Sequence, residues 1–140
     1  MPMDCIFCKI INREIPASII YESDEVLAFL DIHPTTKGHA LVIPKQHSAD
    51  FATSKPEVAG ALAQATQQVA TAVMTATGSQ GFNININNGV VAGQVIFHVH
   101  WHIIPRYEGD GLRLWAEGYG YEAGEAASLA QQIKADLASK

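Results

Sequence analysis

The sequence has few charged residues and no cluster of positive ones. Only 16% of its 140 residues are charged, and the formal net charge is −5. A protein that binds a nucleic-acid polymer neutralises many phosphates with lysine and arginine. The composition therefore argues against a nucleic-acid polymer as a partner, while a mononucleotide stays compatible with a few local cations.

Long hydrophobic runs are also missing. No stretch approaches the roughly 20 apolar residues of a transmembrane helix, and residues 1–5 lack the charged and apolar regions of a secretory signal. We therefore expect a cytoplasmic protein with no membrane partner. Hydrophobic residues make up 48% of the chain, which is typical of a globular protein. The length predicts one domain, residues 1–140.

Cysteine is scarce, and the only two cysteines, Cys5 and Cys8, are three positions apart. Disulfides are disfavoured in the cytoplasm. A Cys-x-x-Cys pair is half of a tetrahedral zinc site. Spacing alone leaves two interpretations open, half a metal site or two reduced thiols.

Histidine, in contrast, is concentrated in one short segment. His98, His100 and His102 alternate with Val99 and Trp101. Side chains repeat with period two in a strand, so the pattern predicts three imidazoles on one face. Imidazole is a metal ligand, a nucleophile and a proton carrier near neutral pH. We therefore expect the chemistry of the protein to lie here.

The hydrophobic pattern predicts an α+β fold. Helices are expected over residues 5–13, about 55–77 after an N-cap at Ser54, and 125–137; strands are expected over residues 18–22, 26–30, 39–44, 81–87 and 95–104. The strands cluster on both sides of one long helix, a pattern typical of a mostly antiparallel sheet of about five strands.

Three stretches together resemble the histidine triad (HIT) family. The stretch from Gly93 to Arg106 carries His-φ-His-φ-His-φ-φ, where φ is apolar, and the others begin at Ile6 and Ala28. The resemblance covers roughly residues 5–106 in the family's order. It implies a HIT-like fold and a nucleotidyl hydrolase or transferase that acts at an α-phosphate through a nucleotidyl-histidine intermediate.

The resemblance also implies a role for particular residues. By motif position His100 is the nucleophile, His102 and His39 lie beside it at the phosphate, and His98 completes the catalytic histidines. The implied substrate contacts are the ribose-binding carboxylate of Asp31, the amide of Asn87, and an apolar base slot formed by Ile6, Phe7, Ile10, Phe29 and Ile32. Independently of the resemblance, the amide of Gln94 is expected as a further donor to phosphoryl oxygens. The substrates implied are purine nucleoside phosphoramidates or dinucleoside polyphosphates.

Relatives with the cysteine pair suggest how a zinc site could be completed. By this resemblance, His47 and His98 join Cys5 and Cys8, which gives a closed structural zinc site. Two alternatives use the same residues. The histidine cluster could bind a catalytic zinc in a metal-dependent hydrolase, or the chain could be a non-catalytic nucleotide-binding module.

Two further features bear on these expectations. Val95 stands where many family members carry serine or threonine near the phosphate, which removes a hydroxyl donor. The helix expected over about residues 55–77 carries more apolar and small residues than one sheet face needs. Together with the resemblance, this surplus predicts a homodimer.

Overall fold

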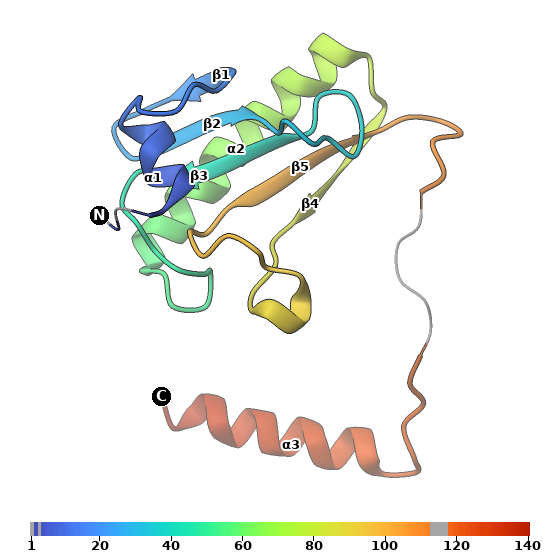
Figure 1. Cartoon of the computed structure of the whole chain (residues 1–140). Helices are drawn as coiled ribbons and strands as arrows, with labels where there is room; N and C mark the ends of the chain where they lie inside the picture. The colour runs from blue at the N-terminus through green and yellow to red at the C-terminus, as the bar shows by residue number, and fades with distance from the viewer. Residues whose placement is uncertain (1, 3, 113–117) are drawn as a thin grey trace. The chain divides into compact units, whose positions relative to one another are not determined.

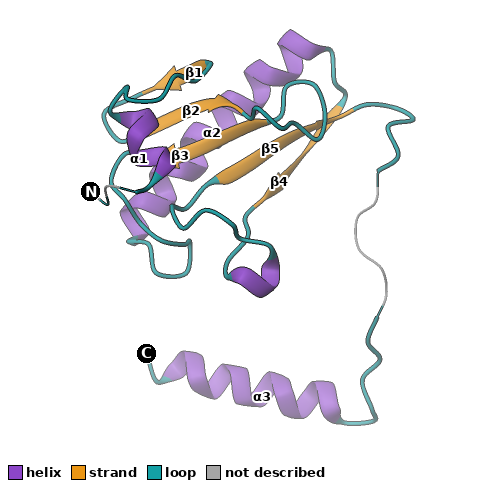
Figure 2. Cartoon of the chain, viewed as in Figure 1, coloured by secondary structure: helices purple, strands orange, loops and turns teal. Residues whose placement is uncertain are grey.

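The computed structural model describes residues 2, 4–112 and 118–140. The chain divides into two compact units, Met1–Asp110 and Gly111–Lys140, and the assignment of all 140 residues to one domain stays a prediction. The elements of the first unit are α1 (Ile6–Ile11), β1 (Ile19–Glu22), β2 (Val26–Leu30), β3 (Ala40–Pro44), α2 (Pro56–Thr77), β4 (Gly81–Asn85), the 3₁₀ turn η1 (Val90–Ala92) and β5 (Trp101–Arg106) (Figures 1 and 2).

The five strands form one antiparallel sheet in the order β1-β2-β3-β5-β4. This arrangement confirms the predicted α+β fold. The pairing of β3 with β5 joins segments far apart in the sequence and sets Leu41 opposite His102 and Ala40 opposite Ile103. Since directly opposed residues share a face, this register determines which side chains meet on each side of the sheet.

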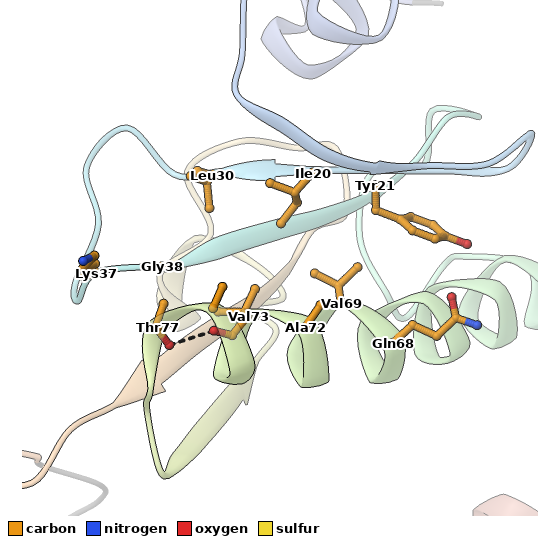
Figure 3. Close-up of a pocket in the computed structure, with 11 residues that line it drawn as sticks. Ile20, Tyr21, Leu30, Lys37, Gly38, Gln68, Val69, Ala72, Val73 and Thr77 are labelled. Carbon is orange, nitrogen blue, oxygen red and sulfur yellow. Dashed lines mark hydrogen bonds between the residues drawn. The ribbon is translucent and has the colours of Figure 1, made fainter.

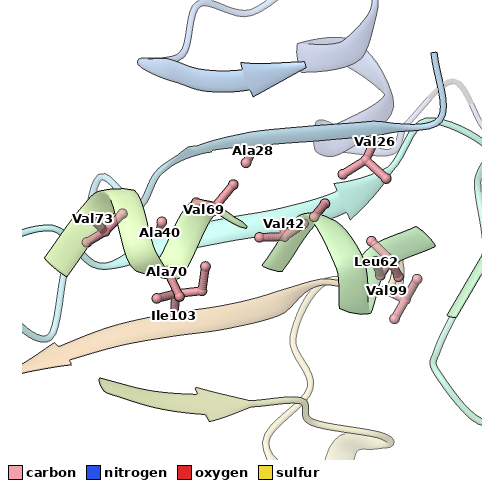
Figure 4. Close-up of a cluster of buried hydrophobic side chains, with 11 residues drawn as sticks. Val26, Ala28, Ala40, Val42, Leu62, Val69, Ala70, Val73, Val99 and Ile103 are labelled. Atoms are coloured by element: carbon pink, nitrogen blue, oxygen red, sulfur yellow. The ribbon is translucent and has the colours of Figure 1, made fainter. Parts of the chain in front are cut away.

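Helix α2 covers one face of the sheet, which we call the helix face. Its apolar stripe, including Leu62, Val69 and Val73, packs against Val42 of β3 and Ile103 of β5 (Figure 4). Val99 joins the same cluster. The core of the fold therefore lies between α2 and the centre of the sheet.

The opposite face carries a second apolar cluster beneath α1. Phe7 and Ile10 of this short helix pack on Phe29 of β2 and on Leu41 and Ile43 of β3. Because β2 and β3 are buried on both faces, their sequences are continuous apolar runs rather than alternating ones. His102, opposite Leu41, lies on this second face, which we call the histidine face.

The ends of α2 differ slightly from the prediction. Its N-cap is Lys55, with Pro56 at the first helical position, so the predicted N-cap at Ser54 is wrong. The Ser54 hydroxyl instead donates to the carbonyl oxygen of Asp50. At the other end the helix stops at Gly78, whose φ of 73° is left-handed.

The strand predicted over residues 95–104 begins only at Trp101 and continues to Arg106. The preceding segment bonds to a loop instead of to a neighbouring strand, since the main-chain N–H of Val99 donates to the carbonyl oxygen of Ser48. The strand predicted over residues 81–87 likewise ends at Asn85. Apolar alternation continues beyond the ladder at both places, which is why sequence periodicity overestimates these strands.

The second unit contains α3 (Glu125–Ala138), close to the helix predicted over residues 125–137. No helix in the described ranges of the chain is long and apolar enough to cross a membrane.

Gly38, just before His39, lies in a turn that leaves no room for a side chain. Its φ is 92°, and an added Cβ would lie 2.8 Å from Cγ2 of Thr77 and 3.2 Å from Cγ of Pro105. We expect Gly38→Ala to lower the free energy of unfolding by about 1–3 kcal/mol, measured by urea denaturation.

Gly60, in the interior of α2, provides the matched control, since an added Cβ there meets no heavy atom within 4 Å. Gly60→Ala should raise the free energy of unfolding by roughly 0.5–1 kcal/mol, because alanine favours a helix more than glycine does. Equal effects of the two substitutions would contradict this account of Gly38.

Candidate active site

The three clustered histidines lie on the histidine face. The ring of Phe7 contacts the rings of His98 and His100, at centroid distances of 5.8 and 5.1 Å, and the ring of His102 lies 5.0 Å from that of His100. Val99 belongs to the core of the helix face. The predicted separation of the two sets of side chains therefore holds even though β5 begins only at Trp101.

His39 joins this row from the start of β3. Its Nε2 lies 2.9 Å from Nδ1 of His102, and the His39 side chain is buried. Asp31, at the end of β2, places Oδ2 at 3.6 Å from Nε2 of His39. Its Oδ1 accepts the main-chain N–H of His33 at 2.8 Å. One carboxylate oxygen of Asp31 thus stabilises a turn, while the other faces the histidines.

The hydrogen bond of His100 indicates which ring nitrogen keeps its lone pair. Its Nδ1 lies 2.8 Å from the carbonyl oxygen of His98. A carbonyl oxygen only accepts, so Nδ1 carries the proton in the neutral ring. The lone pair therefore lies on Nε2, which leaves this nitrogen able to act as a nucleophile or as a ligand.

Burial keeps these rings neutral near pH 7. It lowers the pKa of His39 and His100 from the ordinary value, and in both cases the Asp31 charge opposes the shift. Burial, with His100 and His39 as neighbours, lowers the pKa of His102 to about 4. Neutral imidazoles keep the lone pair that nucleophilic or ligand chemistry needs.

A second cluster combines the cysteine pair with His47 and His98. Sγ of Cys5 and Sγ of Cys8 lie 3.4 and 3.6 Å from Nδ1 of His98, Sγ of Cys8 lies 3.4 Å from Nδ1 of His47, and the two Nδ1 atoms are 3.1 Å apart. Tetrahedral zinc, bonded to nitrogen at about 2.0 Å and to sulfur at about 2.3 Å, sets its ligands roughly 3.1–3.8 Å apart. The donor types and spacings fit zinc.

The surroundings of this cluster also suit a metal. Nε2 of His98 lies 2.8 Å from the carbonyl oxygen of Pro44, which assigns the proton to Nε2 and leaves Nδ1 as the ligand atom. Burial, together with the adjacent Cys5 thiol, raises the pKa of Cys8 to about 11 in the metal-free protein. A bound cation would reverse this shift because it stabilises the thiolate.

The residues predicted to form the base slot separate by burial. Phe7, Ile10 and Phe29 are buried in the cluster beneath α1. Ile6 is 42% exposed and Ile32 is 82% exposed. The buried three are core side chains, and the exposed two leave apolar surface on which a planar base could lie.

The two side-chain amides predicted to contact the substrate differ in the hydrogen bonds that they make within the protein. Gln94 is buried, accepts the N–H of Gly89 and donates both side-chain hydrogens, to the carbonyl oxygens of Ala49 and Ile96. Its amide therefore shapes the loop before the histidines instead of presenting a donor to the phosphate. Asn87 is half-buried, and its Oδ1 accepts from Nδ2 of Asn85.

Sequence reasoning missed three main-chain groups that control these histidines. The N–H of Thr35 donates to Nδ1 of His39 at 3.0 Å, and the carbonyl oxygens of His98 and Pro44 orient His100 and His98. No side-chain pattern reports main-chain groups, so only the folded loops show them.

A cavity of about 440 Å³ lies elsewhere, between α2 and strands β1 and β2. Ile20, Leu30, Val69 and Val73 are among its apolar lining residues (Figure 3). It opens on the helix-face side and contains none of the histidines or cysteines. The cavity is therefore separate from the histidines and cysteines described above.

Comparison with known proteins identifies the family. A model of the HIT domain matches residues 12–109. The chain is 48% identical over 113 residues to an adenylylsulfatase of Arabidopsis thaliana, covering 81% of this chain and 56% of that protein. It is 39% identical over 136 residues to the adenosine 5′-monophosphoramidase of Schizosaccharomyces pombe, covering 96% of this chain and 99% of that protein.

Solved structures agree. A Streptococcus mutans protein matches with a TM-score of 0.93 at 38% identity, over 98% of this chain and 87% of that one. A zinc-bound histidine triad family protein of Mycobacterium smegmatis matches with a TM-score of 0.76 at 40% identity, over 95% of this chain and 98% of that one. The chain belongs to the HIT family, and its relatives support a nucleotide hydrolase or transferase in the general sense.

The lowered pKa of His102 predicts how stability depends on pH. A histidine titrates near 6.5 in the unfolded chain, and His102 titrates at about 4 in the folded one. Between these values the unfolded chain binds more protons, so the contribution of His102 is complete above pH 6.5 and is lost as the pH falls toward 4.

We expect the urea midpoint to fall over this range, and we expect His102→Gln to reduce the slope relative to wild type. His33→Gln, at an exposed histidine in the loop after β2, is the control and should keep the wild-type slope. An unchanged slope in His102→Gln would contradict the assignment.

Proposed function

We propose that this protein is a nucleotidyl hydrolase or transferase that acts at the α-phosphate of purine nucleoside phosphoramidates or dinucleoside polyphosphates. The observation that carries the proposal is the hydrogen bond from Nδ1 of His100 to the carbonyl oxygen of His98. It leaves a neutral imidazole with its Nε2 lone pair available beside two further imidazoles, those of His102 and His39.

The proposed reaction proceeds in two steps. Nε2 of His100 forms a bond to phosphorus while the bond to the leaving group breaks, and the leaving group departs with the electron pair. An amine leaving group also takes up one proton. Water then attacks phosphorus, the phosphorus–nitrogen bond breaks, and the water releases the balancing proton. Two easier steps thus replace one difficult step.

The neighbouring side chains supply binding and charge stabilisation in this proposal. In this mechanism His102 and Asn87 donate to phosphoryl oxygens, which carry the charge that develops in the transition state, and His39 orients His102. Oδ2 of Asp31 is the acceptor for the ribose hydroxyls, and apolar surface at Ile6 and Ile32 receives the base. A single carboxylate oxygen suits two neighbouring hydroxyls because it can accept more than one hydrogen bond.

The names of two relatives support this choice of substrate. One is an adenosine 5′-monophosphoramidase and the other an adenylylsulfatase. Both names describe an adenylyl group joined through phosphorus to a leaving group that differs between the two. We infer that the protein recognises the purine nucleotide part of the substrate and discriminates little between leaving groups.

We further propose that Cys5, Cys8, His47 and His98 hold a structural zinc. The support is the fit of their donor spacings to a tetrahedron and the zinc-bound relative from Mycobacterium smegmatis. Four protein ligands close the coordination shell, so such a zinc would tie α1 to the histidine segment and leave no position for water. The predicted homodimer and cytoplasmic location stay predictions.

Replacing His100 tests the proposed nucleophile. We expect His100→Ala to lower kcat/KM on adenosine phosphoramidate by several orders of magnitude while AMP binding, measured by calorimetry, changes little. Rapidly denatured wild-type protein should carry one nucleotidyl group by mass spectrometry. His33→Ala removes an exposed histidine from the loop after β2 and should keep the wild-type rate. More than about a tenth of the wild-type rate in His100→Ala would sink the assignment.

Metal analysis tests the structural zinc. Freshly purified, reduced protein should contain about one zinc per chain, and the double variant Cys5→Ser/Cys8→Ser should contain none. The double variant should unfold at lower urea concentration yet retain activity at low temperature. Absence of zinc from the wild type would refute the proposal. Loss of all activity to a chelator, with the fold intact, would instead indicate the metal-dependent hydrolase.

A further inference from the structure

Two clusters on the histidine face offer ligand atoms for a metal. Cys5, Cys8, His47 and His98 form one, and Asp31, His39 and His102 form the other; within each, the ligand atoms lie within 4.8 Å of one another. A carboxylate with two imidazoles is a set of ligands that zinc and other transition metals accept. The types of ligand therefore do not explain why a metal would choose one cluster over the other.

The hydrogen bonds behind the ligand atoms do separate the clusters. An imidazole binds a metal through a lone pair, and its other nitrogen then carries the proton and needs an acceptor. His98 meets this requirement, since its Nε2 faces the carbonyl oxygen of Pro44. His39 does not, because its Nδ1 faces the main-chain N–H of Thr35 at 3.0 Å.

We propose that the Thr35 N–H fixes the tautomer of His39 and, through it, that of His102, and thereby keeps transition metals out of the Asp31–His39–His102 cluster. A main-chain N–H only donates. Nδ1 of His39 must therefore accept, and the ring proton lies on Nε2, the atom that faces the cluster. A metal bound at Nε2 would require the ring proton to move to Nδ1. The Nδ1–H of His39 would then face the main-chain N–H of Thr35, and two donors would lie opposite each other without an acceptor.

The same hydrogen bond determines the proton on His102. Nε2 of His39 donates to Nδ1 of His102 at 2.9 Å, so the proton of His102 lies on its own Nε2. His100 has the opposite tautomer, with its lone pair on Nε2. Resting on the proposed function, this gives the phosphate one attacking imidazole and one donating imidazole, as transfer to His100 requires.

The loop that carries the Thr35 amide is fixed at several points. The Asp31 carboxylate accepts the N–H of His33, the Thr36 hydroxyl donates to the carbonyl oxygen of Pro105, and the Tyr107 hydroxyl donates to that of Lys37. The side chain of Thr35 is itself exposed. Thr35 therefore acts as a positioning residue through its main chain, and its side chain can be replaced without removing the donor.

Nitrogen-15 NMR of the imidazole rings tests the tautomers directly in the wild-type, zinc-loaded protein near pH 7. We expect Nδ1 of both His39 and His102 to appear unprotonated and their Nε2 to carry hydrogen, with the reverse in His100. A protonated Nδ1 on His39 overturns the inference. The measurement uses no substrate, so a protein without nucleotidyl transfer activity would refute the proposed function and leave this inference standing.

A zinc titration tests the exclusion of metal. Thr35→Pro removes the N–H, and Thr35→Ala retains it as the matched control. Zinc added beyond the first equivalent should bind Thr35→Pro about 10–100-fold more tightly than wild type or Thr35→Ala, as expected for a change in a group behind a ligand. It should shift the His39 and His102 ring signals. Equal affinity in all three proteins overturns the inference. If Thr35→Pro does not fold, the wild-type ring spectrum decides alone.

Discussion

The antiparallel pairing of β3 with β5 is the constraint on which the candidate site depends. Its register sets Leu41 opposite His102, and this brings His39, just before β3, within hydrogen-bonding distance of a residue 63 positions away. The helix face makes the same pairing stable, because Val42 and Ile103 are buried together against α2. A shift of one residue would exchange the two faces and move the histidines into the apolar core. The core beneath α2 thus fixes the position of imidazoles that it does not touch.

Main-chain groups then assign a role to each imidazole. The four neutral histidines would otherwise be chemically alike. The carbonyl oxygens of Pro44 and His98 accept the ring N–H of His98 and of His100, respectively. The main-chain N–H of Thr35 donates to the ring of His39. Each of these partners can act in only one direction, so His98 and His39 keep the lone pair on Nδ1, whereas His100 keeps it on Nε2. Through these main-chain partners His98 becomes a candidate metal ligand, His100 a candidate nucleophile and His39 a donor.

The sequence predicts much of this arrangement because its strongest signals are periodic. Alternation over residues 98–103 separates the histidines from Val99 and Ile103, and the structure retains that separation. Alternation does not show where hydrogen bonding between strands ends, so β5 begins later than predicted. The position of Gln94 suggested a phosphate contact, yet its side chain is used by the loop. A single polar residue in a loop is compatible with several roles, and only the tertiary contacts show which role it has. The main-chain partners of the histidines leave no trace in the residue types.

Helix α1 links the cysteine cluster to His100. It has six residues, too few to be stable alone, and it remains folded through what it contacts. Its Phe7 lies between the two cysteines in the sequence, and its ring touches both His98 and His100. Order at either contact therefore restrains the other. In thermodynamic terms the cysteine cluster and the site at His100 are linked: if a ligand at one site orders α1 and thereby favours binding at the other, the coupling free energy is equal in both directions.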